Sequence, residues 1–430
     1  MRALRVSIPG EFYDSQIYDG RLYLWGIDGS FLTIDWNLLV DKISIPKELK
    51  TALSFSLQYG DNLYRNLLMQ DLEVKQLMQY KFQKLSELAI EIDQRDLNNS
   101  VIGQQDNPLP FPHADSAVHY KTIYAGGQSG VSASSCSVGR GRKQSIEPAK
   151  RLFDMPTLSI SASHLTLAVA AGNEGLFDYS LISNNTRKHG EPRQLSDKHC
   201  NLAQWLYPSI FGSSYFNEGY FADFKESKRS KARKEQSSQN FVQLVLPKTS
   251  ETSLIEEDEN ERSVRKSKRE FKGLISSKEI LSGSKLDENK ISEGDTTFTW
   301  GVQDKICSIT GSSIKLAGYT SQSKPNQQKF NDLGFVKMDE LSGEIISADS
   351  SLFGVVIEKE NGLLIINSSL ESQFLEGEPV NWRVFPRSIN YTNQLHVVYE
   401  DALHIYSFNH DYFVDQSTKK MGISVASAKN

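Results

Sequence analysis

The stretch Tyr18-Asp-Gly-Arg-Leu-Tyr-Leu-Trp-Gly-Ile-Asp-Gly-Ser-Phe-Leu-Thr-Ile-Asp-Trp36 decides the fold class of this chain. The dipeptide Asp28-Gly29 separates two apolar, aromatic runs, and Asp19-Gly20 precedes the first of them. Asp-Gly between apolar runs is the strongest short-range signal for a β-hairpin, because tight hairpin turns need a positive φ that glycine adopts readily. The segment therefore predicts a pair of antiparallel strands.

Six more segments of the chain follow a similar pattern. A polar stretch leads into an apolar run, then a short turn rich in glycine or acidic residues, and then a second apolar run. The seven hairpin units span residues 16–36, 118–136, 158–181, 205–224, 298–319, 345–366 and 393–408. Repetition of one supersecondary unit along the chain is typical of a repeat architecture.

Residues 47–97 do not follow the hairpin pattern. After Pro46, apolar side chains recur every three to five residues without an internal proline, which is near the helical period. The segment predicts a helical hairpin with its break near Gly60. The stretch Asn107-Pro-Leu-Pro-Phe-Pro112 predicts an extended connector, because proline does not continue a helix.

Residues 225–295 form a second interruption, dominated by charge. Lys225 to Lys234 contains six basic residues, Glu256 to Glu261 five acidic ones, and Arg262 to Lys272 six basic ones. Such a composition cannot bury enough apolar area to offset the entropy of ordering, so we expect a disordered loop. One apolar run inside it, Phe241 to Leu246, could form a strand that completes the fourth unit.

Without the two interruptions, about 291 residues remain, or about 42 for each of seven units, and WD40-type blades contain roughly 40–45 residues. The chain thus resembles the WD40-like β-propeller architecture, which implies a mainly β, seven-bladed ring. The Gly-His and Trp-Asp pairs of the WD40 sequence family are absent, so the resemblance is to the repeat class, and the count of blades stays between six and eight. The expected organisation is a propeller of residues 1–46, 115–224 and 296–413, a helical insertion with its connector at 47–114, a charged insertion at 225–295, and a tail at 414–430.

The two ends of the expected propeller contain complementary segments. Leu4 to Ile8 reads as a strand, and Ser407-Phe-Asn-His-Asp-Tyr-Phe413 follows the last hairpin. We expect these segments to meet and close the ring, because closure removes the edge strands that make open sheets prone to aggregation.

Composition excludes several classes of protein. The chain has 430 residues, a net charge of −5 and 38% hydrophobic residues, and it contains no apolar run of the roughly 18 residues that a membrane helix needs. No secretory leader is visible, and the three cysteines fit neither a disulfide framework nor a zinc site, which indicates the cytoplasm. Phosphate-loop, zinc-protease and nucleophile-elbow motifs are absent, so we expect no cofactor, no metal and no catalytic residues.

The densest group of candidate binding residues lies in Pro379 to Tyr391. Aromatic residues and arginine are enriched at binding hot spots, and we assign a partner-binding role to Trp382, Arg383, Phe385, Arg387, Tyr391 and, in the cluster after the last strand, His410. The alternative interpretation is that the two large aromatic residues are blade core and that the arginines are solvated. The histidines of the last hairpin, His396 and His404, read as edge or solvent-facing strand residues.

Three functions compete at this stage. The first is a non-enzymatic scaffold or regulatory subunit of a cytoplasmic multiprotein complex, with partners on a propeller face or on the helices of 47–97. The second is an enzyme or small-molecule sensor with a site in the propeller channel, to which acidic residues of several turns would contribute: Asp28, Glu174, Asp304, Glu360 and Asp401. The third is a nucleic-acid contact through the basic blocks of 225–272, which the net negative charge disfavours.

Overall fold

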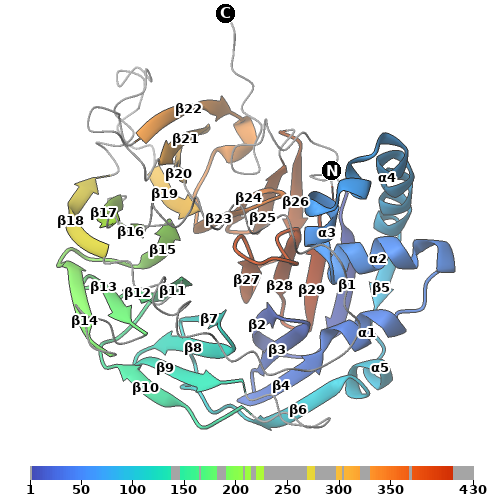
Figure 1. The fold of residues 1–430 in the computed structure, drawn as a ribbon, viewed down its shortest axis with the longest axis horizontal. Helices are drawn as coiled ribbons and strands as arrows, with labels where there is room; N and C mark the ends of the chain where they lie inside the picture. The colour runs from blue at the N-terminus through green and yellow to red at the C-terminus, as the bar shows by residue number, and fades with distance from the viewer. Residues whose placement is uncertain are drawn as a thin grey trace, which may run out of the picture.

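The chain folds as a seven-bladed β-propeller of the WD40-like architecture (Figure 1). The computed structural model describes residues 2–136, 146–163, 166–181, 190–206, 209–214, 219–226, 269–276, 297–302, 305–319, 330–367 and 370–409. Six described sheets have four antiparallel strands and the seventh has five. All seven hairpins expected from the sequence are paired strands of these sheets.

Each blade runs from an inner strand at the channel to an outer strand at the rim. The first three blades are β2 (Phe12–Tyr18), β3 (Arg21–Gly26), β4 (Ser30–Asp35) and β6 (Val101–Asp106); β7 (Asp115–His119), β8 (Thr122–Gly127), β9 (Gly130–Ser135) and β10 (Lys150–Phe153); and β11 (Ser159–Ser163), β12 (Thr166–Ala170), β13 (Leu176–Ser180) and β14 (Pro192–Ser196). The next three are β15 (Leu202–Leu206), β16 (Ser209–Ser213), β17 (Gly219–Glu226) and β18 (Arg269–Ser276); β19 (Thr297–Val302), β20 (Lys305–Thr310), β21 (Ser313–Tyr319) and β22 (Phe330–Lys337); and β23 (Ser347–Ser351), β24 (Gly354–Lys359), β25 (Gly362–Asn367) and β26 (Ser372–Glu376).

Both ends of the chain build the seventh blade, which closes the ring. It consists of β27 (Asn381–Val384), β28 (Gln394–Val398), β29 (Ala402–Ser407), β1 (Leu4–Pro9) and β5 (Ala89–Glu91). The N-terminal β1 pairs antiparallel with the C-terminal β29, from Leu4 opposite Ser407 to Pro9 opposite Ala402. The N-terminal strand thus closes the ring, but its partner is the last strand of the final hairpin. Of the cluster 407–413 that was expected to meet it, residues 410–413 lie outside the described part of the chain.

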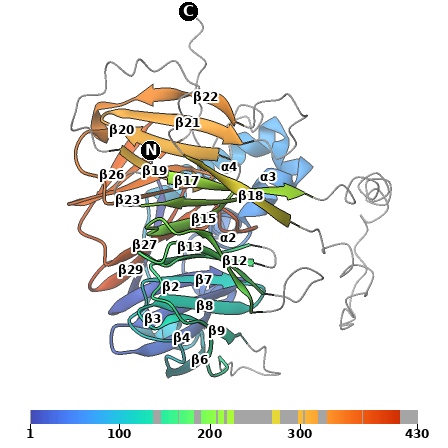
Figure 2. The same ribbon diagram turned by 90° about the vertical axis from the view of Figure 1, so that its left-hand side faces the viewer.

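The helical insertion lies outside the ring, against the closing blade (Figures 1 and 2). It leaves the first blade after β4 and returns at β6, and its elements are α1 (Trp36–Lys42), η1 (Lys47–Leu49), α2 (Lys50–Leu57), α3 (Gly60–Arg65), η2 (Leu67–Gln70), α4 (Leu72–Ser86), β5 and α5 (Gln94–Asn98). Its last turns differ from the helical expectation, because residues 89–91 form a strand that pairs parallel with β1. The insertion thus connects the first blade to the seventh.

The C-terminal carbonyls of α2 hold the insertion to the closing blade. The amides of Asn393 and Gln394 donate to the carbonyl of Ser56 at 3.0 and 3.2 Å, and Gln394 also donates to the carbonyl of Leu57 at 3.0 Å. The indole of Trp36 donates to the same Leu57 oxygen at 2.7 Å. The last carbonyls of a helix have no partner within the helix, so these buried side chains supply the donors that they need.

A different strand from the expected one completes the fourth blade. The outer position belongs to β18, which pairs with β17 from Tyr220 opposite Ser276 to Glu226 opposite Arg269. The expected strand at Phe241 to Leu246 lies outside the described residues, as does most of the predicted disordered segment 225–295. Strand β18 lies within that segment, so the charged interruption is shorter than the sequence suggested.

Removing the donor of Gln394 without changing its shape tests the contact between insertion and blade. We expect Gln394→Met to lower the free energy of unfolding by about 1–3 kcal/mol, because the carbonyls of α2 lose a buried donor. Urea denaturation followed by circular dichroism measures this change. Gln94→Met on the exposed surface of α5 is the matched control, and equal effects of the two variants would contradict the account.

Candidate functional site

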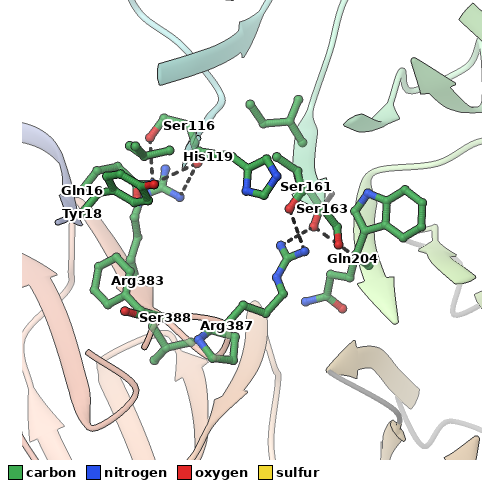
Figure 3. Close-up of a pocket in the computed structure, with 18 of the residues that line it drawn as sticks. Gln16, Tyr18, Ser116, His119, Ser161, Ser163, Gln204, Arg383, Arg387 and Ser388 are labelled. Carbon is green, nitrogen blue, oxygen red and sulfur yellow. Dashed lines mark hydrogen bonds between the residues drawn. The ribbon is translucent and has the colours of Figure 1, made fainter. Parts of the chain in front are cut away.

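The propeller channel contains a cavity of about 800 Å³. Its walls come from the inner strands of several blades and from the loop after β27, and Figure 3 shows Arg383 and Arg387 entering it from the seventh blade. The lining mixes hydroxyl, amide, charged and aromatic side chains. This volume lies within the roughly 300–1,000 Å³ of typical small-molecule sites.

The inner strands have an edge that no strand of their own sheet covers. Backbone groups on such an edge need other hydrogen-bond partners. Here a polar side chain from a neighbouring blade bridges each of the seven junctions, and we call these contacts the channel belt. The belt consists of Gln16 Nε2 to Ser116 O at 3.0 Å, Ile160 N to Asp115 Oδ2 at 2.8 Å, Trp205 N to Ser161 Oγ at 3.2 Å, Gly301 N to Gln204 Oε1 at 2.6 Å, Trp300 Nε1 to Ser350 Oγ at 2.9 Å, Ser351 Oγ to Thr392 O at 2.6 Å, and Arg383 Nε to Asp14 Oδ1 at 2.6 Å.

The strongest contact of the belt joins the last blade to the first two. The guanidinium of Arg383 contacts both oxygens of Asp14, at 2.6 and 2.8 Å, and donates to Asp115 Oδ1 at 3.0 Å. Asp14 also accepts from Ser116 Oγ at 2.6 Å and lies 2.8 Å from Nε2 of His113. Its side chain is only 1% exposed, so this carboxylate is a buried, fully surrounded charge.

The two charges stabilise each other's ionised forms. Burial alone raises the pKa of Asp14, but the Arg383 guanidinium and His113 outweigh it and hold that pKa well below its usual range. Burial lowers the pKa of Arg383, whereas Asp14 and Asp115 raise it above its ordinary value. Removal of one member of such a pair leaves an uncompensated buried charge, which typically costs about 3–5 kcal/mol.

A repeated dipeptide in the sequence, separate from the hairpin pattern, marks some of these channel residues. The dipeptide Asp-Ser occurs on three inner strands, at Asp14, Asp115 and Asp349. In each case the carboxylate accepts the N–H of the following serine, at 2.7, 2.8 and 2.7 Å. The carboxylate therefore satisfies an edge N–H of its own strand, which explains why the same pair recurs on separate blades.

The candidate partner-binding residues of Pro379 to Tyr391 lie at the channel and the closing seam. Trp382 donates to Glu358 of the neighbouring blade at 2.8 Å, and Phe385 lies edge-on to His396 with ring centroids 4.7 Å apart. Arg387 crosses the cavity to β11, and the buried Tyr391 accepts the N–H of Gly20 at 2.9 Å. His410 lies outside the described residues, and partner binding by this group stays a prediction.

The expectation for His396 was wrong. Its side chain is completely buried, with Nδ1 3.2 Å from Ser15 Oγ, whereas the sequence suggested an edge or solvent-facing residue. Burial lowers the pKa of His396 to about 3, so the ring is neutral at physiological pH. The cause of the error is its position on β28, which the seventh blade encloses between two further strands.

The acidic residues offered for a channel site do not converge there. Asp28, Glu174, Glu360 and Asp401 lie in turns between consecutive strands, and none of them lines the cavity. Asp28 accepts the N–H of Ser30 at 2.9 Å, as expected of a turn residue. Asp304 lies outside the described residues.

Asp349 is the channel carboxyl with an unusual protonation state. Burial, and to a smaller extent Asp115, raise its pKa to about 7 despite the opposing effects of the Ser350 N–H and of Arg387. An unfolded aspartate titrates near 3.9. The folded protein therefore keeps a proton on Asp349 that the unfolded chain loses above about pH 4, so the stability contribution of this group falls progressively between about pH 4 and pH 7.

We expect Asp349→Asn to stabilise the protein at pH 8 and to stabilise it clearly less at pH 5, where the unfolded aspartate has only begun to gain from losing its proton. Asparagine keeps the oxygen that accepts the Ser350 N–H but carries no charge to bury. The gain at pH 8 is at most about 4 kcal/mol, since each unit of pKa corresponds to about 1.4 kcal/mol. Melting temperatures measured at both pH values test this expectation, and a variant less stable than the parent at pH 8 would contradict it.

The described residues give no support to a metal site or to a membrane-spanning helix. Within the described ranges, no three His, Cys, Asp or Glu side chains gather where they could hold a metal ion. No helix in the same ranges is long and apolar enough to cross a membrane. The cysteines Cys136, Cys200 and Cys307 form no disulfide and are buried, and burial raises the pKa of each thiol.

Comparisons with known proteins give matches in structure and none in sequence. No family model matches the chain, and no curated protein sequence matches it. Among 625 matching chains of solved structures is one described as "Crystal Structure of Mitotic Checkpoint Complex", with 9% identity, coverage of 72% of this chain and 80% of that chain, and a TM-score of 0.39. The assignment to the propeller class rests on the strand pairing of this chain itself.

Proposed function

We propose that the protein is a non-enzymatic interaction scaffold, or a regulatory subunit, of a cytoplasmic multiprotein complex. The observation that carries this proposal is a row of solvent-exposed apolar side chains on the helical insertion. A ring of rigid blades supplies a fixed frame, and the insertion supplies the docking surface. This surface supports the proposal more than the fold does, because a propeller fold alone does not determine what a protein binds.

The row lies on η2 and α4, and we call it the leucine face: Leu67, Leu68, Leu72, Leu77 and Tyr80. The first three of these residues are 85%, 72% and 68% exposed. Other leucines of the insertion, Leu53, Leu57 and Leu85, are buried. Clustered apolar side chains that stay in water are typical of protein interaction sites.

The helix α4 has two apolar sides with different surroundings. Met78, Phe82 and Leu85 are buried against the rest of the insertion and the closing blade, in the same core cluster as β1. Leu72 and Tyr80 lie eight residues apart, about two turns, and are exposed on the other side. The core of the chain therefore does not need the leucine face.

The chemistry of the surface favours an apolar partner, such as an amphipathic helix of another protein. Charged side chains next to the leucine face have both signs, among them Glu73, Lys84 and Glu87, and Lys84 pairs with Glu87 at 3.1 Å. A surface of mixed charge gives little electrostatic selection, so contact area from the leucines would dominate affinity. An amphipathic partner helix would lay its own apolar side against such a surface.

The double variant Leu68→Ser/Leu72→Ser tests the proposal. We expect it to fold like the parent, because both side chains are exposed, and to lose at least about 10-fold in affinity for its partner. The partner is first isolated from the native host at stoichiometric level and mapped by cross-linking to α4, and affinity is then measured by calorimetry with purified components.

Phe335→Ser is the matched control, because Phe335 is 54% exposed on the outer strand of a blade far from the insertion in the chain. Retention of full affinity by the double variant, or an equal loss in the control, overturns the proposal. Self-association of the parent that the double variant abolishes would identify a second copy of the chain as the occupant in place of another protein.

A further inference from the structure

Arg387 lines the channel cavity, is solvent-exposed there, and forms no ion pair with a carboxylate of the described residues. From the loop after β27 it reaches across the cavity to β11, where Nη1 donates to Ala162 O and Nη2 to Ser161 Oγ, both at 2.8 Å (Figure 3). Both acceptors are neutral. Within the described part of the chain, no carboxylate oxygen lies within 4.0 Å of its guanidinium, whereas Arg383 contacts two carboxylates.

This arrangement leaves both charge and donors available to a ligand. A guanidinium has five N–H donors, of which the two contacts to β11 occupy two. Desolvation by the surrounding channel walls lowers the pKa of Arg387, and Asp349 opposes this effect only from a distance beyond an ion pair. A guanidinium that faces a cavity and has unused donors can hold an anion, because hydrogen bonds between charged groups are stronger than neutral ones.

The other walls of the cavity limit what that anion can be. Asp19, Asp115 and Asp349 also line it, so a molecule with many negative charges would meet repulsion. Hydroxyl and amide groups come from Ser163 and Gln204, and Figure 3 shows His119 directed into the same space. The cavity of about 800 Å³ suits a small molecule rather than a folded partner.

We infer that the propeller channel binds a small organic anion, whose single carboxylate or phosphate group is held by Arg387 beside the hydroxyls of β11. The amide of Gln204 on the neighbouring blade and the ring of His119 contact the neutral remainder of the ligand. This site is separate from the leucine face, so it does not rest on the proposed scaffold function, and either can fail without the other.

Calorimetric titration of the full chain with four probes tests the site: inorganic phosphate, glycerol 3-phosphate, lactate and glycine, each at constant ionic strength set with sodium chloride. We expect at least one probe to bind with a dissociation constant of about 1 mM or tighter. Preference for the first two probes identifies a phosphate site, and preference for the last two a carboxylate site. Failure of all four probes to bind overturns the inference.

Variants assign the binding to the channel. Arg387→Gln should weaken the bound probe at least about 10-fold, while Arg151→Gln, which changes an exposed arginine outside the cavity, should leave affinity unchanged. Undiminished binding by Arg387→Gln, once its melting curve shows that it folds, overturns the inference.

Asp349→Asn provides a second test that keeps every contact of Arg387 in place. It removes a negative charge from the cavity wall, so the probe should bind several-fold more tightly at pH 8. Unchanged or weaker binding by this variant contradicts an anion site at Arg387, and this outcome does not depend on whether Arg387→Gln folds.

Discussion

The buried contact between Arg383 and Asp14 is the constraint on which the rest of the ring depends. A propeller must bring its last blade against its first, and the two residues are 369 positions apart in the chain. The backbone closes the ring through β1 and β29, and this ion pair closes it at the channel. Because both partners are buried, neither can be lost without exposing the other to an environment that cannot solvate its charge.

Polar contacts also hold neighbouring blades together at the other junctions of the ring. Every inner strand has an uncovered edge, and at each junction a side chain of one blade bonds a group of the next, as with Gln204 and Gly301. Polar side chains also hold the helical insertion to the ring: the amides of Asn393 and Gln394 donate to the last carbonyls of α2. Polar side chains therefore set the spacing of the blades, and the apolar core fills the space between their faces.

The sequence predicted what depends on neighbouring residues and missed what depends on distant ones. The hairpins could be predicted because a turn such as Asp28-Gly29 depends only on residues next to each other in the chain. The number of hairpins then gave the number of blades. The surroundings of His396 and Arg387 in the channel could not be predicted from the sequence, because they form only when seven inner strands meet. The repeated Asp-Ser pair was the available clue. Strand β18 was missed because its basic residues resemble those of the surrounding charged segment.

A double-mutant cycle on Asp14→Asn and Arg383→Met measures the central contact most directly. Urea denaturation of the parent, the two single variants and the double variant at neutral pH gives the coupling free energy between the two side chains. The account predicts that each single variant is strongly destabilised and that the coupling is about 2 kcal/mol or more. Additive effects, with a coupling below about 0.5 kcal/mol, would contradict the view that this pair holds the ring closed.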